Sequence, residues 1–350
     1  MLLKYLLTIF STLLLFTACS KVINEESNSQ AIVTVIQEEG KSKPEQRSFH
    51  PLSQNPEVTK YCKDKVQPAF DKYAWGDAHC MDLPWMNVRK SHKGDPLVWI
   101  VFGDETKRTT QTNTTIILCT IHGDEIVPTK FCFDIIIDLY QNPNHLTQND
   151  LVIVAPIVNP DSFFINKPSR VNAKGVDINR NFPTRDWHKS ALPIWIKNYR
   201  RDPRRFPGSR PLTEPEVVFQ VNLLNRYKPN KIISIHAPLT LLDYDGPAKT
   251  KTGKAGGVDK NLAMELLIQM SEKASGYKVS NYPYFPGSLG NYAGNELRVP
   301  TYTLELPTTD WHKTDDFWKR FQPAIIHAIQ ESFDQADEET AANFQNLIDP

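Results

Sequence analysis

The chain has 350 residues, and its 40 Lys and Arg residues are balanced by 40 Asp and Glu residues, so its formal net charge is zero. This balance supplies no long-range field for nucleic acid, and we expect no nucleic-acid partner. Hydrophobic residues make up 40% of the chain, which suits a globular core of ordinary size. At about 150 residues per domain the length allows two domains or one large α/β domain. We favour one main domain, because a leader and a linker use part of the length.

Residues 1–18 have the pattern of an export signal, in which Lys4 precedes an almost entirely apolar run from Leu6 to Phe16. That run is too short to span a bilayer comfortably. The following letters, FTACS at 16–20, resemble the lipobox of bacterial lipoproteins, whose lipid would be carried by Cys19. By this resemblance we predict an exported, periplasm-facing lipoprotein of the outer membrane. A plain secretory peptide with an incidental cysteine is the alternative.

The polar stretch 19–55 predicts a flexible tether between the leader and a folded body. Export makes disulfides possible. Cys62 and Cys80 lie in an N-terminal extension of one helix and one strand, 56–95, and we expect the two cysteines to form a bridge. Cys119 and Cys132 fall in an apolar strand and in the helix after it, and we expect both to be small buried thiols.

The rest of the chain alternates between strand and helix patterns. In chain order, the predicted elements are a helix at 57–74, strands at 97–102 and 115–121, a helix at 128–139, a strand at 151–156, a loop-rich stretch at 157–212, a helix capped by Thr213 and Glu216 and ending near Tyr227, a strand at 231–235, a helix at 260–275, a strand at 301–306, a helix at 317–333 and a polar tail at 336–350. This order predicts an α/β domain over 96–335, built on a mixed, mainly parallel twisted sheet with helices on both faces.

Three of these strands end in groups that can do chemistry. His122 follows the strand at 115–121, His236 follows the strand at 231–235, and Glu305 lies in the strand at 301–306. In such sheets the carboxyl ends of the strands carry the site. With Glu125, the two histidines make a standard catalytic zinc set that leaves one position open for water. A single histidine at a strand end is more often a hydrogen-bonded core residue, so the combination carries the prediction.

A further stretch places charged residues inside an apolar frame. In RVNAKGVDINRNFP, at 170–183, Asp177, Asn179 and Arg180 alternate with apolar residues. Side chains held in this way favour a prebuilt anion site. The alternative is a solvated loop with a polar bend.

Together these motifs resemble those of the M14 zinc carboxypeptidases, over roughly residues 95–335. The matching motifs are His122-x-x-Glu125, NPD at 159–161, GVDINRNFP at 175–183, SIHAP at 234–238 and TYTLELP at 301–307, in the order of the family. The stretch at 170–183 is most similar to that of the murein peptide amidases and D,L-carboxypeptidases, which trim peptidoglycan stem peptides.

The resemblance implies roles for residues in the metal centre. His122, Glu125 and His236 would bind one Zn²⁺ ion per chain. Glu305 would be the general base and acid, and Arg170 would hold the developing oxyanion.

The resemblance also implies a substrate site. Asn179 and Arg180 would bind the terminal carboxylate of a peptide, and Asp177 would accept a hydrogen bond from His122 and set its tautomer. A tyrosine that covers the substrate in some relatives cannot be matched to one tyrosine in 282–292. We expect the basic run at 200–205 to be a solvated loop face rather than part of a groove.

The leading interpretation is cleavage of stem peptides at the γ-D-Glu–diaminopimelate bond. A general L-peptide carboxypeptidase is an alternative, although no side-chain pocket residue for it is evident in 282–300. An N-acyl-amino-acid deacylase and a non-catalytic wall-binding lipoprotein are the others.

Overall fold

The computed structural model describes residues 55–247 and 260–333. The predicted leader, the lipid site at Cys19, the tail at 336–350 and nearly all of the tether lie outside these residues. Within the described ranges, no helix is both long enough and apolar enough to cross a membrane.

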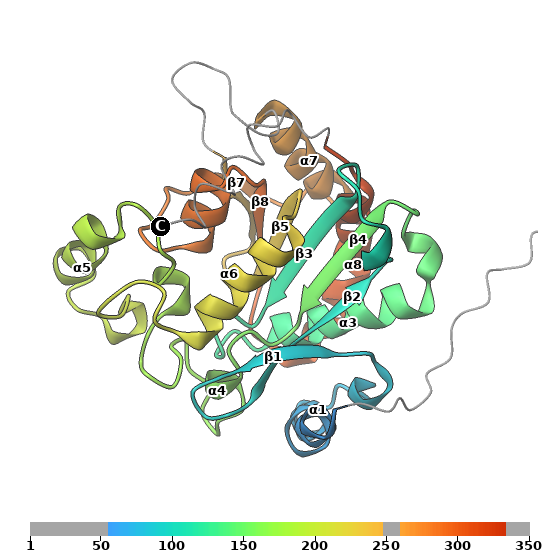
Figure 1. The fold of residues 1–350 in the computed structure, drawn as a ribbon, viewed down its shortest axis with the longest axis horizontal. Helices are drawn as coiled ribbons and strands as arrows, with labels where there is room; N and C mark the ends of the chain where they lie inside the picture. The colour runs from blue at the N-terminus through green and yellow to red at the C-terminus, as the bar shows by residue number, and fades with distance from the viewer. Residues whose placement is uncertain (1–54, 248–259, 334–350) are drawn as a thin grey trace, which may run out of the picture. The chain divides into compact units, whose positions relative to one another are not determined.

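One eight-stranded sheet forms the centre of the fold, with the strand order β1-β2-β4-β3-β5-β8-β6-β7 (Figure 1). Its strands are β1 (Met86–Lys90), β2 (Pro96–Phe102), β3 (Asn113–Cys119), β4 (Asp150–Ala155), β5 (Lys231–His236), β6 (Leu241–Tyr244), β7 (Val279–Ser280) and β8 (Thr301–Glu305). The central pairs β4/β3, β3/β5 and β5/β8 are parallel, whereas β1/β2, β2/β4 and β6/β8 are antiparallel. The predicted mixed, mainly parallel sheet is therefore confirmed, and β1 is the strand expected in the N-terminal extension at 56–95, although β6 and β7 were not predicted.

Helices cover both faces of the sheet. They are α1 (Pro56–Tyr61) and α2 (Gln67–Lys72), joined by one π-helical stretch, α3 (Val127–Gln141), α4 (Pro160–Phe163), α5 (Trp187–Lys197), α6 (Pro215–Tyr227), α7 (Lys260–Lys273) and α8 (Thr314–Gln330). Side chains of α3, α7 and α8 share one apolar core with one face of the sheet, and α6 shares a second core with the other face. Figure 1 shows α6 in front of the sheet, with α3 and α8 behind it.

The side chains of β5 and β8 alternate between these two faces. Ile233 and Ile235 point into the core under α3, α7 and α8, as do Tyr302 and Leu304 from β8. Successive side chains of a strand point to opposite faces, so the residues between them face the other side of the sheet. That side carries the polar groups of the candidate site.

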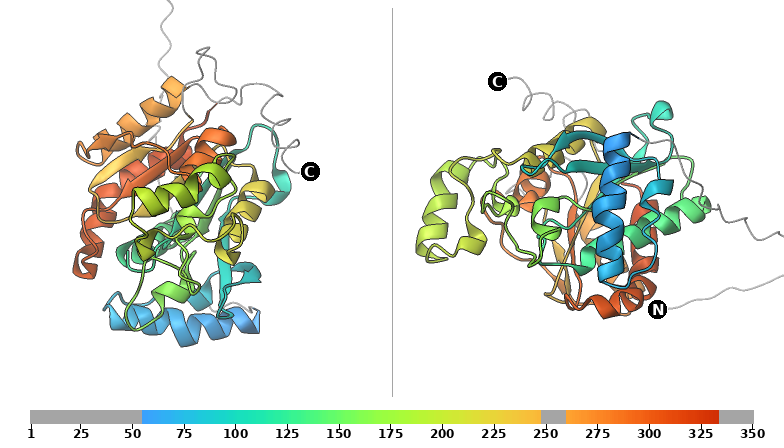
Figure 2. Two further views of the ribbon diagram at one scale, coloured as in Figure 1. Left: turned by 90° about the vertical axis from the view of Figure 1, so that its left-hand side faces the viewer. Right: turned by 90° about the horizontal axis from the view of Figure 1, so that it is seen from below.

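The N-terminal extension packs against the end of the fold opposite α7, where Figure 2 shows it in blue. Residues of α1 and α2 form a third apolar cluster with side chains from β2, α3 and α4. The predicted bridge between Cys62 and Cys80 is present, with a Cα–Cα distance of 5.5 Å.

Two local predictions were wrong. Cys119 and Cys132 form a disulfide rather than two free thiols, because the end of β3 lies beside α3 and brings the Cα atoms to 6.3 Å. The helix α6 has Glu214 rather than Thr213 at its N-cap, without a side-chain cap. Glu216 does not reach back to close a capping box, because it is buried and accepts a hydrogen bond from Asn172 Nδ2 at 3.0 Å.

Candidate active site

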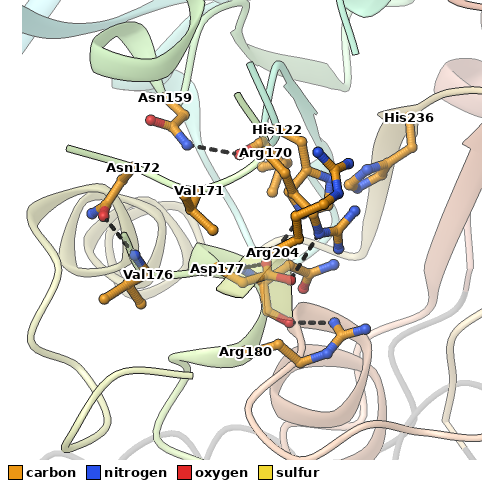
Figure 3. Close-up of polar contacts among 12 residues, drawn as sticks. His122, Asn159, Arg170, Val171, Asn172, Val176, Asp177, Arg180, Arg204 and His236 are labelled. Atoms are coloured by element: carbon orange, nitrogen blue, oxygen red, sulfur yellow. Dashed lines mark hydrogen bonds and ion pairs between the residues drawn. The ribbon is translucent and has the colours of Figure 1, made fainter. Parts of the chain in front are cut away.

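A tight turn after β3 carries the first two predicted ligands. It is held to the neighbouring segment by Asn159, whose Nδ2 donates to the carbonyl of Ile121 at 3.1 Å (Figure 3). A Cβ atom on Gly123 would lie 2.6 Å from the backbone nitrogen of Phe163. Only glycine therefore allows this close packing, which holds His122 and Glu125 against α4.

His122, Glu125 and His236 converge, with one possible ligand atom from each lying within 4.8 Å of the others. The Glu125 carboxylate lies between the two histidines, with Oε1 2.6 Å from His122 Nδ1 and Oε2 2.9 Å from His236 Nδ1. Two imidazoles and one carboxylate suit zinc, and they leave a fourth position free. The residues present therefore fit the ion that the sequence motifs imply.

The second nitrogen of each imidazole has its own partner. His122 Nε2 lies 3.2 Å from Asp177 Oδ1, and His236 Nε2 lies 3.0 Å from the hydroxyl of Ser234. Such partners fix the ring orientation and leave Nδ1 of each ring available for an ion that the set would hold. Asp177 thus lies where the resemblance places it, behind His122.

Arg170 connects this carboxylate to the metal-binding set. Its Nε donates to Asp177 Oδ2 at 3.0 Å, and its Nη1 lies 3.4 Å from Glu125 Oε1. Burial by itself would raise the pKa of Asp177, but the charges of Arg170 and His122 outweigh burial and hold this pKa well below its usual value. Asp177 is therefore an anion that orients both Arg170 and His122 (Figure 3).

Asn179 and Arg180 lie on the next turn of the same segment. Asn179 Oδ1 accepts the backbone N–H of Leu289 at 2.8 Å, which fixes the amide. The Arg180 guanidinium lies 4.4 Å from the centroid of the Phe285 ring, and its Nη1 donates to the Asn179 carbonyl at 2.6 Å. Arg180 is only 9% exposed, and no carboxylate lies within ion-pair distance of it among residues 55–247 and 260–333. A buried cation in this state suits an anionic group supplied by a ligand.

Glu305 is the remaining predicted residue, and β8 places it directly beside His236 in the parallel register with β5. Its Oε2 accepts the backbone N–H of Leu239 at 3.2 Å. Burial raises the pKa of Glu305, and the nearby charge of His236 offsets part of the rise. A carboxylate with a raised pKa can accept and return a proton near neutral pH.

All of the predicted site residues except the fully buried Asp177 line one open cleft of about 570 Å³. The cleft also contains residues whose position the sequence did not reveal: Asp124, Arg204, Arg205, Asp243 and Asp245. The basic run is solvated as expected, with the Arg204 side chain 58% exposed, but Arg204 and Arg205 also line the cleft, and Arg204 pairs with Asp124 at 2.7 Å. For Asp243 and Asp245, the sequence offers one indication of their position. The alternation in LLDYD at 241–245 places both side chains on the same face of a strand.

Comparison with known proteins agrees with this geometry. The family model described as zinc carboxypeptidase, Peptidase M14, matches residues 84–338. The chain belongs to the M14 zinc carboxypeptidase family. It is therefore a peptidase.

Relatives within the family include murein peptide amidases. That of Vibrio campbellii is 29% identical over 195 residues, covering 55% of this chain and 68% of the relative. The murein peptide amidase A of Escherichia coli K12 is 29% identical over 223 residues, which cover 62% of this chain and 79% of the relative. Among solved structures, carboxypeptidase A of Helicoverpa armigera superposes with a TM-score of 0.57 at 16% identity, over 80% of this chain and 73% of that one. This M14 chain therefore shares the carboxypeptidase fold with distant members.

Proposed function

We propose that this M14 peptidase uses zinc to hydrolyse an amide bond next to a free carboxylate in peptidoglycan stem peptides, at the γ-D-Glu–diaminopimelate bond. The observation that carries the proposal is the convergence of His122, Glu125 and His236 in one cleft that Glu305 and Arg180 also line. Among the described residues, Arg180 has no carboxylate within ion-pair distance. The resemblance to murein peptide amidases supports the choice of substrate.

The protein groups have separate tasks in this reaction. His122, Glu125 and His236 would hold a zinc ion, which would supply Lewis acidity and lower the pKa of the attacking water toward about 7. Glu305 accepts a proton from the attacking water and later donates one to the leaving amine. Arg170, oriented by Asp177, faces the negative charge that develops on the carbonyl oxygen.

The free carboxylate of the substrate is bound on the leaving-amine side of the scissile bond. The planar guanidinium of Arg180 can donate two parallel hydrogen bonds to a carboxylate. Phe285 holds this guanidinium by stacking, and Asn179 lies beside it. A free carboxylate on the leaving amino acid therefore sets the register of the substrate in the cleft.

The leader suggests where this would occur. We propose that the protein is exported and held at the outer membrane by a lipid on Cys19, facing the wall. Tethering there would raise the frequency of encounter with stem peptides without added affinity.

A muropeptide mixture tests the proposal directly. The zinc-loaded protein is incubated with purified muropeptides, and the products are identified by mass spectrometry. Release of diaminopimelate, or of a peptide that begins with it, supports the proposal. An unchanged mixture, with one zinc per chain and turnover of ordinary L-peptides, would replace it with the general carboxypeptidase.

A further inference from the structure

A second group of side chains, outside the cleft, resembles the catalytic metal-binding set in composition. Among residues 55–247 and 260–333, two groups of His, Cys, Asp or Glu side chains each bring three possible ligand atoms to within 4.8 Å of one another. One is the catalytic set, and the other, which we call the outer cluster, consists of His92, Glu214 and Glu216. None of these three residues lines the catalytic cleft, so the outer cluster has no part in the catalytic set.

The turn between β1 and β2 carries the histidine of the outer cluster. Asp161 of α4 fixes this turn, because its Oδ1 accepts the hydroxyl of Ser91 at 2.6 Å and its Oδ2 accepts the backbone N–H of Lys93 at 3.0 Å. His92 lies between these two residues, and its side chain is 25% exposed. The imidazole is therefore held at the surface, where an ion from solution can reach it.

The two carboxylates of the outer cluster come from the start of α6 and are more deeply buried. Glu214 is 5% exposed, and Glu216 is completely buried. Glu214 Oε2 lies 2.9 Å from His92 Nε2, which equals one of the imidazole–carboxylate distances in the catalytic set. In the part of the chain that the structure describes, His92 is the one basic side chain within ion-pair distance of Glu214, and Glu216 has none.

Asn172 holds the two carboxylates together without supplying a charge. Its Nδ2 donates to Glu214 Oε2 at 2.7 Å and to Glu216 Oε2 at 3.0 Å. Its Oδ1 accepts the backbone N–H of Lys174 at 3.0 Å and that of Val176 at 3.1 Å (Figure 3). Because these two bonds fix the amide, its nitrogen must face the acids.

Two buried oxygens on this face of α6 have no hydrogen-bond partner among the described residues. They are Oε1 of Glu216 and, one helical turn further along, Oε1 of Gln220. Gln220 is 1% exposed, and its Nε2 donates to the Glu216 carbonyl at 3.1 Å. Acidic residues favour the N-terminus of a helix, which accounts for the position of Glu216 but not for an unsatisfied buried oxygen. A cation would provide the missing partner.

The outer cluster also lacks positive charge. Burial by itself would raise the pKa of Glu214, but hydrogen bonds from Asn172 and His92 outweigh burial and hold this pKa below its usual value. Burial raises the pKa of Glu216 to about 7, although the hydrogen bond from Asn172 offsets part of the rise. Glu214 is therefore ionised, and a bound cation would stabilise the charged form of Glu216 as well.

We propose that His92, Glu214 and Glu216 form a second cation site, for a divalent first-row metal ion such as Mn²⁺. The site offers one imidazole nitrogen and carboxylate oxygens, a mixed set that suits such ions, whereas Ca²⁺ prefers oxygen ligands alone. The ion would join the turn between β1 and β2 to the start of α6, and these two segments are 122 residues apart in the chain.

The ion would also support the reaction centre through Asn172. This residue lies in the loop that carries Arg170 and Asp177, and its backbone N–H donates to the Val176 carbonyl at 2.9 Å (Figure 3). An ion that fixes the two carboxylates fixes the acceptors of Asn172 Nδ2. The ion is therefore structural, and its binding does not depend on which bond the enzyme cleaves.

The first experiment titrates the full-length enzyme, already loaded with one zinc per chain, with Mn²⁺. Zinc is bound more tightly than manganese by the same donors, so the catalytic set keeps its zinc. Electron paramagnetic resonance of free Mn²⁺ gives the number of bound ions, and metal analysis after dialysis checks the zinc. We expect one bound Mn²⁺ per chain, which an equal concentration of Ca²⁺ does not displace. No binding at millimolar Mn²⁺, or displacement by equal Ca²⁺, would overturn the proposal.

Variants then locate the ion. His92→Ala removes the nitrogen ligand, and Glu216→Gln removes one charge while it keeps an acceptor for Asn172, so in each variant the Mn²⁺ affinity should fall at least about tenfold. His145→Ala is the matched control, because this imidazole also lies 2.7 Å from a carboxylate, that of Asp138, and its side chain is 29% exposed. The control should bind Mn²⁺ as the unmodified enzyme does. Unchanged affinity in His92→Ala, or an equal loss in the control, would overturn the site.

Thermal unfolding gives a measurement that needs neither a variant nor a substrate. At a Mn²⁺ concentration about 100-fold above the dissociation constant, the unfolding midpoint of the zinc-loaded enzyme should rise by about 5 °C. A midpoint that Mn²⁺ does not raise would contradict the second site and leave the proposed function intact. A raised midpoint in an enzyme that cleaves no muropeptide would support the second site and contradict the proposed function alone.

Discussion

The two faces of the sheet at β5 and β8 carry opposite chemistry within the same short strands. On one face, Ile233 and Leu304 are buried in the core under α3, α7 and α8. On the other face, Ser234 and His236, the neighbours of Ile233 and Ile235 along β5, face the cleft. Adjacent residues of the strand therefore serve either the apolar core or the cleft. A shift of the strand by one residue in register would turn the core side chains toward the cleft and the polar side chains toward the core. This arrangement makes the two contributions separable by mutation.

The largest effect is expected on the polar face, at the proposed general base Glu305. Glu305→Gln removes the group that accepts the proton, so turnover should fall about 10⁴-fold while zinc remains bound. Steady-state kinetics and metal analysis of the same sample measure both quantities. A variant that keeps near wild-type turnover would remove Glu305 from the mechanism.

Neighbouring residues of β5 provide the clearest contrast. Ile233→Ala opens a cavity in the apolar core and should lower the free energy of unfolding of the metal-free protein by about 3 kcal/mol, with zinc affinity per folded molecule unchanged. Ser234→Ala removes the hydroxyl 3.0 Å from His236 Nε2 and should instead weaken zinc binding about tenfold.

Urea unfolding and zinc titration of both variants check this contrast. Similar losses of stability and of zinc affinity in the two variants would mean that the faces are not independent.

A smaller effect is expected at the carboxylate site. Arg180→Ala should raise KM about 30-fold for substrates that end in a free carboxylate, because a charged hydrogen-bonded contact contributes about 2 kcal/mol. The same substrates with an amidated end serve as the control and should change little. An equal rise in KM for the free and the amidated substrates would show that Arg180 supports the loop through its contact with Phe285 rather than binding the carboxylate.

The smallest effect concerns a charge on the apolar face. Lys231 is completely buried at the start of β5, and burial lowers its pKa from 10.5 to about 7. Between these two values the unfolded chain binds more protons than the folded chain, so stability should rise with pH by up to about 1.4 kcal/mol per unit.

Lys231→Met removes this titration and serves as the reference. Urea unfolding of both proteins at pH 7, 8 and 9 gives the difference in stability between them. A difference that does not grow in favour of the lysine protein would show that Lys231 stays charged when folded.

The sequence predicted the parts of the fold that repeat a strong pattern. Long apolar strands and amphipathic helices were recognised, and so was the set His122, Glu125, His236 and Glu305, because each lies at or near a strand end. The structure brings these residues into one cleft, with Arg170 and Arg180 beside them.

The missed parts depend on contacts between distant segments. Strand β6 has four residues, and its pairing with β8 places Asp243 on the face of the sheet that lines the cleft, which the alternation at 241–245 alone does not establish. Helix α5 falls within the stretch at 157–212 that the sequence predicts to be loop-rich, and it contains Pro193, which is unfavourable inside a helix. The bond between Cys119 and Cys132 required knowledge of how α3 packs on β3.

That bond has a consequence for how the metal site matures. Cys119 lies three residues before His122, and Cys132 lies seven residues after Glu125, so the disulfide encloses both ligands in one covalent ring. In a reduced and still unfolded chain the two thiols would be zinc donors that compete with the imidazoles, whereas in the fold both sulfur atoms lie in the apolar core under α3. Oxidation leaves only nitrogen and oxygen donors around the turn. The order of oxidation and metal binding therefore matters. A chain that forms the disulfide first would offer zinc only the imidazole and carboxylate ligands. A chain that encounters zinc first would also offer it the two cysteine sulfurs.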